Sequence, residues 1–401
     1  MRDFLDLLQR RPHLRRLWLA QVTSSLGDWL SYVAVSVLVV HAGGGPLALA
    51  SVLILHLLPN ALLAPFAGAL ADRRDRRAVM IGAHLVRAAL TVGMALAAVA
   101  GSVVGVQVLL ALRVIVGAFF VPAERAALPR LVEPDDLILA NRLDAFTWAV
   151  LFTAGVALGG VLAAVVGPTA ALLVDAATFV LGALVLRGLP PLLPPPRATG
   201  APRGLDLAGG WRAARTDPAL LRAALAKGPV LLASCGGWVT LNLVALTTPG
   251  PLDGALLLGL LQAARGLGTG VGPLLARPDA DGRLADPLTL GAIALFGLQS
   301  HWAGLLLAAF LWGMGSGHAW VWTTSTVQRL GGDAVMGRLS ALDLVCHTLG
   351  GAMGALLGGL VVTWTGVPAH AAWAGVAAGA LAMAAVRWGT RAPASLVAPA
   401  V

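Results

Sequence analysis

Long apolar segments separated by short breaks run through almost the whole chain and limit the folds open to it. A helix that crosses a bilayer needs about 20 apolar residues. Segments near that length are found at residues 17–42, 47–71, 78–100, 103–121, 141–165, 168–187, 219–247, 254–276, 285–300, 302–326, 338–362 and 367–388. The sequence therefore predicts an all-α membrane protein with twelve transmembrane helices.

The composition indicates the same environment. Of the 401 residues, 58% are hydrophobic and 12% are charged, whereas a soluble domain carries about 25% charged residues. So few charges cannot cover a water-facing surface, which excludes a soluble enzyme, a disordered chain and a disulfide-stapled secreted domain. Cys235 and Cys346 lie in apolar segments and form no metal pair or disulfide framework. We expect no cofactor and no metal.

Arginines are distributed so that they orient the predicted helices. The breaks after odd-numbered segments, at 43–46, 101–102, 166–167, 248–253 and 363–366, hold no lysine or arginine, whereas the breaks after even-numbered segments do. Positively charged loops stay in the cytoplasm, so both termini are predicted to be cytoplasmic. The net charge of +9 then needs no nucleic-acid partner. The single lysine, Lys227, among many Ala, Gly and Arg residues is typical of a high-GC bacterium, which places the chain in a bacterial inner (plasma) membrane.

A proline-rich stretch at residues 188–218 separates two sets of six predicted helices and is expected to be an extended, semi-rigid linker. The predicted organisation is a cytoplasmic segment at 1–16, a six-helix bundle at 17–187, the linker, a second bundle at 219–388 and a cytoplasmic tail at 389–401. An internal repeat supports two related halves. Gly155, Gly159, Gly160 and Gly167 recur 199 positions later as Gly354, Gly358, Gly359 and Gly366. Paired repeats of this kind are a transporter design with a central substrate site.

Several motifs carry a family resemblance. Residues 68–77 read G-A-L-A-D-R-R-D-R-R, which resembles the G-x-L-x-D-R-x-x-R-R loop signature of the major facilitator superfamily. The segments 25–29 (S-L-G-D-W), 119–125 (F-F-V-P-A-E-R) and 175–179 (D-A-A-T-F) follow in the matching order. Together they resemble the drug:proton antiporter branch that includes macrolide and enterobactin exporters. The chain departs from that pattern at 155–160, where G-V-A-L-G-G replaces the exporters' G-P-x-x-G-G.

Ionisable residues inside the apolar segments are the first candidates for function. A charge at the bilayer centre costs about 2.5–3.5 kcal/mol, so such residues face the bundle interior and pair with one another. They are Asp28, Arg87, Arg113, Asp175, Arg265 and Asp343.

The resemblance implies that the helices of Asp28 and Arg113 line a central cavity. We expect these two residues to interact, directly or through water, and to couple protons to conformation; the alternative is a static ion pair. Asp175 is expected at the bundle periphery, bonded to a backbone group or hydroxyl. Asp144 and Asp343 are expected to complement helix N-termini. Arg87 and Arg265 are expected to form structural pairs or to bind anionic groups of a substrate.

The resemblance also implies a gating loop in which Asp72 latches against the neighbouring half. Its residues are Gly68, Asp72, Arg73, Arg76 and Arg77. The alternative is that these arginines only fix the topology. Substrate contact is predicted for three tryptophans in helices that line the family's cavity, Trp238, Trp312 and Trp320, and for Arg265 as a group that would bind an anionic part of the substrate. The alternative for the tryptophans is anchoring at the membrane interface.

The favoured function is proton-coupled export of a small lipophilic or natural-product molecule by alternating access. Uptake by a symporter and a non-transporting sensor or scaffold with a transporter fold are the alternatives. An enzyme is not expected, because the zinc, nucleophile-elbow, P-loop and dinucleotide motifs are absent. The expected partners are a small-molecule substrate, protons and the lipid bilayer, and the expected state is a monomer.

Overall fold

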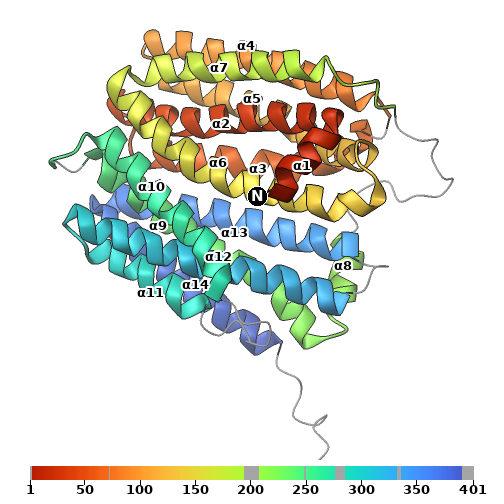
Figure 1. Ribbon diagram of the computed structural model, residues 1–401. Helices are drawn as coiled ribbons and strands as arrows, with labels where there is room; N and C mark the ends of the chain where they lie inside the picture. The colour runs from red at the N-terminus through yellow and green to blue at the C-terminus, as the bar shows by residue number, and fades with distance from the viewer. Residues whose placement is uncertain are drawn as a thin grey trace, which may run out of the picture. The chain divides into compact units, whose positions relative to one another are not determined.

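A computed structural model describes residues 2–71, 73–193, 207–247, 250–275, 285–331 and 336–390. The regular structure in these ranges is entirely helical (Figure 1). The α-helices are α1 (Arg2–Arg10), α2 (Pro12–His41), α3 (Pro46–Ala71), α4 (Arg76–Val99), α5 (Val103–Ala127), α6 (Leu137–Val165), α7 (Pro168–Leu186), α8 (Leu207–Ala214), α9 (Pro218–Thr247), α10 (Gly254–Val271), α11 (Ala285–Leu298), α12 (Trp302–Gly331), α13 (Met336–Thr365) and α14 (Pro368–Gly389).

Each of the twelve predicted segments has its own helix, α2–α7 and α9–α14. Ten apolar spans in the described part of the chain are long enough to cross a membrane, and shorter apolar helices are found at Pro46–Asn60 and Ala285–Leu298. The exposed side chains of these helices are often apolar: Leu96 is 66% exposed and Val99 is 77% exposed. Apolar surface of this extent marks a membrane-facing protein, so the prediction of an all-α membrane protein is confirmed.

Two short helices lie outside the predicted spans. α1 buries Leu7 and Leu8 against Leu14 and Leu143. α8 corrects the prediction of an extended linker, because residues 207–214 are helical and Ala214 packs with Leu339 of α13. No proline lies between Pro202 and Pro218, so nothing in residues 207–214 opposes helix formation. Residues 194–206 lie outside the described ranges.

The chain divides into two compact units. Unit 1 comprises Met1–Gly204 and Leu241–Leu267, and unit 2 comprises Leu205–Thr240 and Gly268–Val401. The end of α9 and most of α10 therefore belong to unit 1, although they follow the linker in sequence. The domain boundaries given above remain a prediction.

In unit 1, α2 packs against α6 and α7, and α4 packs against α5 and α7 (Figure 1). The approach of α2 to α7 depends on Gly27, because a Cβ at this position would collide with the side chains of Asp175 and Thr178. Small residues allow this kind of close helix contact in membranes. The absence of a side chain on Gly27 therefore brings the Asp175 carboxylate to the surface of α2.

The repeated glycines have equivalent roles in the two units. In unit 1, Gly155 and Gly159 of α6 lie against α2 at Trp29 and Leu30. In unit 2, Gly354 of α13 lies against α9 at Leu232, and Gly358 lies one turn further along, against Gly236 of the same helix. Because α2 and α9 each begin one half of the sequence repeat, equivalent glycines pack on equivalent helices, which gives the repeat a structural meaning.

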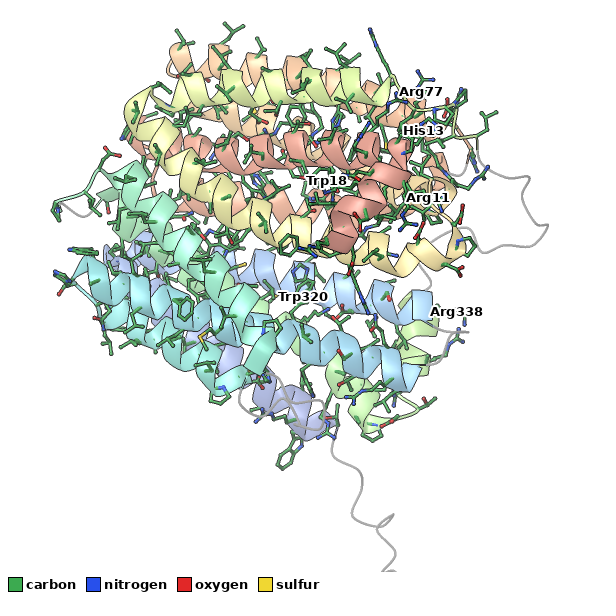
Figure 2. All side chains as sticks on the ribbon, in the orientation of Figure 1. Arg11, His13, Trp18, Arg77, Trp320 and Arg338 are labelled. Atoms are coloured by element: carbon green, nitrogen blue, oxygen red, sulfur yellow. The ribbon has the colours of Figure 1, made fainter. Side chains whose placement is uncertain are left out.

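Basic residues hold the ends of several unit 1 helices together; Arg11 and Arg77 lie at the same end of this unit in Figure 2. Arg77 donates to the carbonyl of Arg187 at 2.6 Å and Arg16 donates to that of Gly188, at the C-terminus of α7. A positive charge is stabilising where helix carbonyls are unpaired. Arg16 and Arg77 thus hold the ends of α2 and α4 to the end of α7.

Arg11 forms ion pairs with Glu133 at 2.6 Å and Asp136 at 2.9 Å. The Arg11 guanidinium, which hydrogen-bonds Glu133, holds the pKa of the Glu133 carboxyl below its ordinary value. The contribution of this pair to stability is therefore present at neutral pH and is lost as the pH falls through the lowered pKa. Because the pair is exposed, its contribution is small.

Asp75 caps α4 and also ties the chain after α7 to it. Its carboxylate accepts hydrogen bonds from the backbone N–H groups of Arg77 at 3.0 Å and Leu192 at 2.8 Å. We expect Asp75→Ala to destabilise the purified protein by about 1 kcal/mol, the usual cost of losing an N-cap. The melting temperature in detergent measures this, with the exposed Asp135→Ala as control. Asp75→Asn, which keeps an acceptor, should lose less; an unchanged Asp75→Ala melting temperature would contradict the assignment.

Candidate functional site

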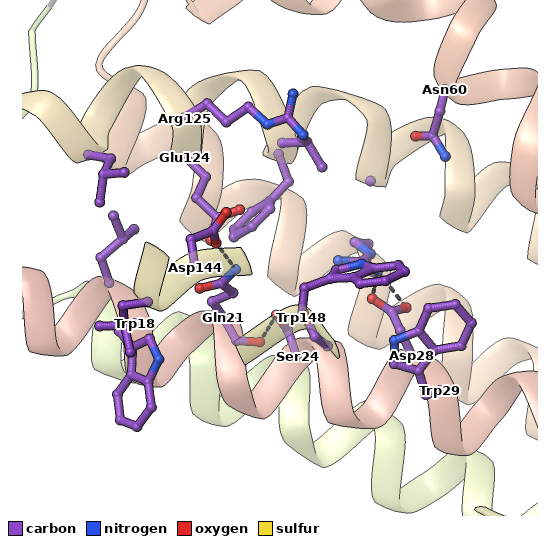
Figure 3. A pocket seen from close by; sticks show the side chains of 18 of the residues that line it. Trp18, Gln21, Ser24, Asp28, Trp29, Asn60, Glu124, Arg125, Asp144 and Trp148 are labelled. Atoms are coloured by element: carbon purple, nitrogen blue, oxygen red, sulfur yellow. Dashed lines mark hydrogen bonds and ion pairs between the residues drawn. The ribbon is translucent and has the colours of Figure 1, made fainter. Parts of the chain in front are cut away.

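A cavity of about 650 Å³ is lined mainly by α2–α6, and all of its lining residues belong to unit 1 (Figure 3). Its volume is within the usual range of small-molecule sites. One part of the wall carries Asp28, Arg87 and Arg113. Trp29 and Trp148 form an aromatic part of the wall. The cavity therefore combines apolar surface with a small number of charged groups.

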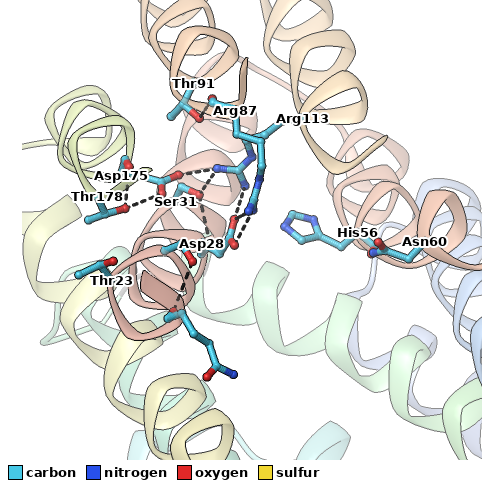
Figure 4. Close-up of polar contacts among 12 residues, drawn as sticks. Thr23, Asp28, Ser31, His56, Asn60, Arg87, Thr91, Arg113, Asp175 and Thr178 are labelled. Carbon is cyan, nitrogen blue, oxygen red and sulfur yellow. Dashed lines mark hydrogen bonds and ion pairs between the residues drawn. The ribbon is translucent and has the colours of Figure 1, made fainter. Parts of the chain in front are cut away.

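The charged wall is a network of two arginines and two carboxylates (Figure 4). Arg87 Nη2 donates to both oxygens of Asp28 at 2.6 Å. Arg113 Nη1 lies 2.5 Å from Asp175 Oδ2 and 2.8 Å from Ser31 Oγ, while Arg113 Nη2 lies 3.6 Å from Asp28 Oδ1. The four charges sum to zero, so the network is neutral although it lies inside the apolar bundle.

The four members differ in their access to the cavity. The Asp28 side chain is 33% exposed, whereas that of Asp175 is fully buried and that of Arg113 is 1% exposed. Phe179 packs against both arginines, with its ring centroid 4.1 Å from Arg87 Cζ and 5.9 Å from Arg113 Cζ. Asp28 is therefore the carboxylate of this network that water in the cavity can reach.

These contacts modify three expectations. Asp28 and Arg113 do approach each other, but the shorter contact of Asp28 is with Arg87. Arg87, which the sequence predicted to form a structural pair or to bind an anionic group, is thus a member of the central network, and its partner Asp28 was not predicted. Asp175 is not peripheral: it is completely buried and pairs with Arg113, while its contact with the Thr178 hydroxyl is longer, at 3.4 Å. Gly27 is the reason, because α7 can approach the centre of unit 1 where α2 has no side chain.

His56 lies beside the network and also lines the cavity (Figure 4). Its Nδ1 is 2.8 Å from the carbonyl of Val52, one turn back in α3. Its ring meets the edge of Tyr32 at 5.5 Å between centroids. The sequence did not predict that His56 lies beside the network, because a single histidine has no spacing that indicates a site. Its position depends on how α2 and α3 pack together.

The predicted gating loop is described in part. Asp72 lies outside the described residues, and Gly68 lies within α3. Arg73 is exposed, whereas Arg76 is buried and donates to the carbonyl of Ala126 in α5 at 2.8 Å. Together with the contact of Arg77 to α7, this bond fixes Arg76 and Arg77 against other helices of unit 1. The proposed role of Asp72 remains a prediction.

The residues predicted to contact substrate do not line this cavity. Trp312 is fully buried in unit 2 and donates to Ser234 Oγ at 3.1 Å, and Trp238 is partly buried in α9. Arg265 Nε donates to Gln262 Oε1 at 3.1 Å inside unit 1. In unit 2, Trp320 lies under the ammonium group of Lys227 at 4.1 Å.

Asp144 and Asp343, which the sequence predicted to complement helix N-termini, have side-chain partners on other helices instead. Asp343 forms an ion pair with Lys227 at 2.6 Å in unit 2. Asp144 accepts a hydrogen bond from the Gln21 amide in unit 1. Both partners come from other helices, α9 and α2, so spacing along one helix could not reveal them.

Comparisons with known proteins agree on one family. The family described as transmembrane secretion effector, of the major facilitator type, matches residues 8–395. The enterobactin exporter EntS of Citrobacter koseri is 30% identical over 380 residues, which is 90% of this chain and 88% of EntS. The uncharacterized transporter YfiS of Bacillus subtilis is 29% identical over 187 residues, 46% of this chain and less than half (44%) of YfiS.

Solved structures show the same fold. The nucleoside transporter NupG has a TM-score of 0.74 at 13% identity, covering 94% of this chain and all of that chain (100%). A bacterial homologue of the iron transporter ferroportin in an inward-facing state has a TM-score of 0.71 at 17% identity, covering 95% of this chain and 99% of that chain.

The buried ion pair gives a stability prediction. Asp175→Asn leaves Arg113 without its fully buried partner, and breaking such a pair costs about 3–5 kcal/mol. We expect a strong loss of monodisperse protein and of melting temperature. The double variant Asp175→Leu/Arg113→Met removes both charges and should recover much of this loss. If the single and double variants are equally destabilised, the pair does not have the structural role assigned to it.

Proposed function

The chain belongs to the transmembrane secretion effector family of the major facilitator superfamily, and on that premise we propose that it is a proton-coupled exporter. The cargo would be a small lipophilic or natural-product molecule, moved by alternating access. The observation that carries the proposal is Asp28, a cavity-facing carboxylate held by Arg87 and Arg113. The 30% identity with a protein named as an enterobactin exporter supports the outward direction.

The proposed architecture has twelve transmembrane helices in two six-helix bundles, with both termini in the cytoplasm. The alternation of arginine-rich and arginine-free loops supports this orientation. The matched packing of the repeated glycines supports two related bundles. The proposed location is a bacterial inner membrane.

Protonation of Asp28 provides a physical route from proton to conformation. Arginine keeps its charge at any physiological pH, so a proton that enters this network must go to a carboxylate. Asp28 can receive it from the cavity, whereas Asp175 is shielded from water. Neutral Asp28 would leave Arg87 without its carboxylate, while Arg113 would keep Asp175. An unpaired cation in an apolar bundle is costly, so Arg87 and its helix α4 would be driven toward a new arrangement.

The gating loop of Gly68, Asp72, Arg73, Arg76 and Arg77 is proposed to bias the two access states. A charged loop changes such an equilibrium only if its contacts differ between the states. The bonds of Arg76 to α5 and of Arg77 to α7 would give the loop a fixed base within unit 1. Asp72 would then be the residue that engages in one state.

The proposal is tested with purified protein in liposomes that contain a pH dye and carry an imposed proton gradient. Lipophilic antibiotics and siderophores are supplied as a panel. We expect substrate-dependent proton movement opposite to that of the substrate, and its loss in Asp28→Asn. Glu133→Gln, which changes an exposed carboxylate outside the cavity, serves as the matched control. Proton and substrate moving together would favour a symporter, and binding without any flux would favour a sensor or scaffold.

A second variant separates coupling from folding. Asp28→Asn leaves Arg87 unpaired and should lower the melting temperature, because the cost of a buried lone charge is several kcal/mol. Adding Arg87→Met removes that charge and should restore stability without restoring proton coupling. Restored coupling in the double variant would show that Asp28 has only a structural role.

A further inference from the structure

The charges that line the cavity are not all used by the ion-pair network. Three carboxylates line it, Asp28, Glu124 and Asp144. Asp28 is paired with Arg87 and Arg113. The remaining two, Glu124 from α5 and Asp144 from α6, have no ion pair with a described residue and lie close together in another part of the wall (Figure 3).

Glu124 is the more unusual of the two carboxylates. Its Oε1 is buried and has no hydrogen-bond partner among the residues that the structure describes. Its neighbour in the chain, Arg125, also lines the cavity and is exposed, but Figure 3 shows the Arg125 guanidinium directed away from the Glu124 carboxylate. Asp144 receives one hydrogen bond, from the amide of Gln21. These two carboxylates can therefore accept more hydrogen bonds than the described residues donate to them.

An aromatic surface lines the same cavity. The indole of Trp148 is 52% exposed and is stacked on Phe152, with 5.7 Å between centroids and 5° between the ring planes. Trp29 meets Phe152 edge-on at 4.6 Å. Because this packing fixes Trp148 from one side, its other face is available to a flat apolar group in the cavity.

We propose that the cavity selects an organic cation, and that Glu124, assisted by Asp144, binds its charged nitrogen. The ligand class is a protonated amine joined to an apolar or aromatic body, with the body against Trp148 and Trp29. This inference rests on the proposed function, since it names the class of cargo that the same cavity would take.

The physical argument is one of complementarity. An enclosed carboxylate oxygen without a donor is unfavourable, and an ammonium N–H is the group that satisfies it most strongly. A neutral analogue of the same shape would leave Glu124 unpaired, so the site would discriminate by charge. The arginines of the network do not offset this preference, because Asp28 and Asp175 already balance them.

The test uses one fluorescent amine and its neutral derivative. Dansylcadaverine has a primary ammonium group at neutral pH, and N-acetyl dansylcadaverine has the same dansyl body and linker without the charge. Binding to the full chain in detergent at pH 7 is measured by energy transfer from tryptophan to dansyl, with empty micelles subtracted. We expect the wild type to bind the amine at least about tenfold more tightly than the acetylated compound, a difference of about 1.4 kcal/mol.

Glu124→Gln keeps the shape of the side chain and removes its charge. We expect it to abolish the preference for the amine while binding of the acetylated compound stays unchanged, which also shows that the variant is folded. Asp144→Asn should reduce the preference in the same direction. Glu133→Gln is the control and should behave as the wild type does.

Two results would overturn the inference: equal affinity of the wild type for both compounds, or a preference that persists in Glu124→Gln. The result of the liposome assay is independent of the result of this binding test. Charge-selective binding without transport would retain the cation site and reject the exporter, whereas proton-coupled export with no charge preference would retain the exporter and reject the cation site.

Discussion

An arginine buried among apolar helices requires a carboxylate beside it, and the organisation of unit 1 follows from that requirement. Arg87 and Arg113 extend from neighbouring helices, α4 and α5, toward the same point. Asp28 and Asp175 meet them from α2 and α7. Four helices are therefore held by one neutral cluster. Because removing any member leaves an opposite charge in a medium of low dielectric constant, the cluster fixes how these helices pack.

Close backbone contact makes this cluster possible. Without Gly27, the side chains of α7 could not reach the centre of unit 1, and Arg113 would lose Asp175. The glycines of α6 have a similar function, since Gly155 and Gly159 bring the wall that carries Trp148 against α2. Small residues and charged residues thus act together: the former set the distance between helices at which the latter can pair.

The helices could be predicted from the sequence because each reflects a local property, an apolar run that ends at Gly, Pro or charged residues. The predicted 168–187 and the observed Pro168–Leu186 differ by a single residue. The partners within the site could not be predicted in this way. Asp28 and Arg87 are far apart in sequence, and no periodicity states which faces of α2 and α4 meet. Asp28 and Arg113 were candidates because they are charged residues inside apolar segments, whereas Glu124 and Asp144 became candidates for ligand binding only once the cavity was described.

Asp28 and Glu124 line the same cavity, whose protein walls make charges interact more strongly than in bulk water. A cation at Glu124 would make a second positive charge, the proton at Asp28, less favourable, and a proton at Asp28 would weaken binding of the cation. By linkage this effect is reciprocal. Suppose that the cavity opens to each side of the membrane in turn and cannot hold both positive charges at once. The cation and the proton would then cross the membrane in opposite directions, which is antiport. Antiport would then follow from the positive charge of the cargo. A neutral cargo would not repel the proton, so it would have to compete with the proton in another way.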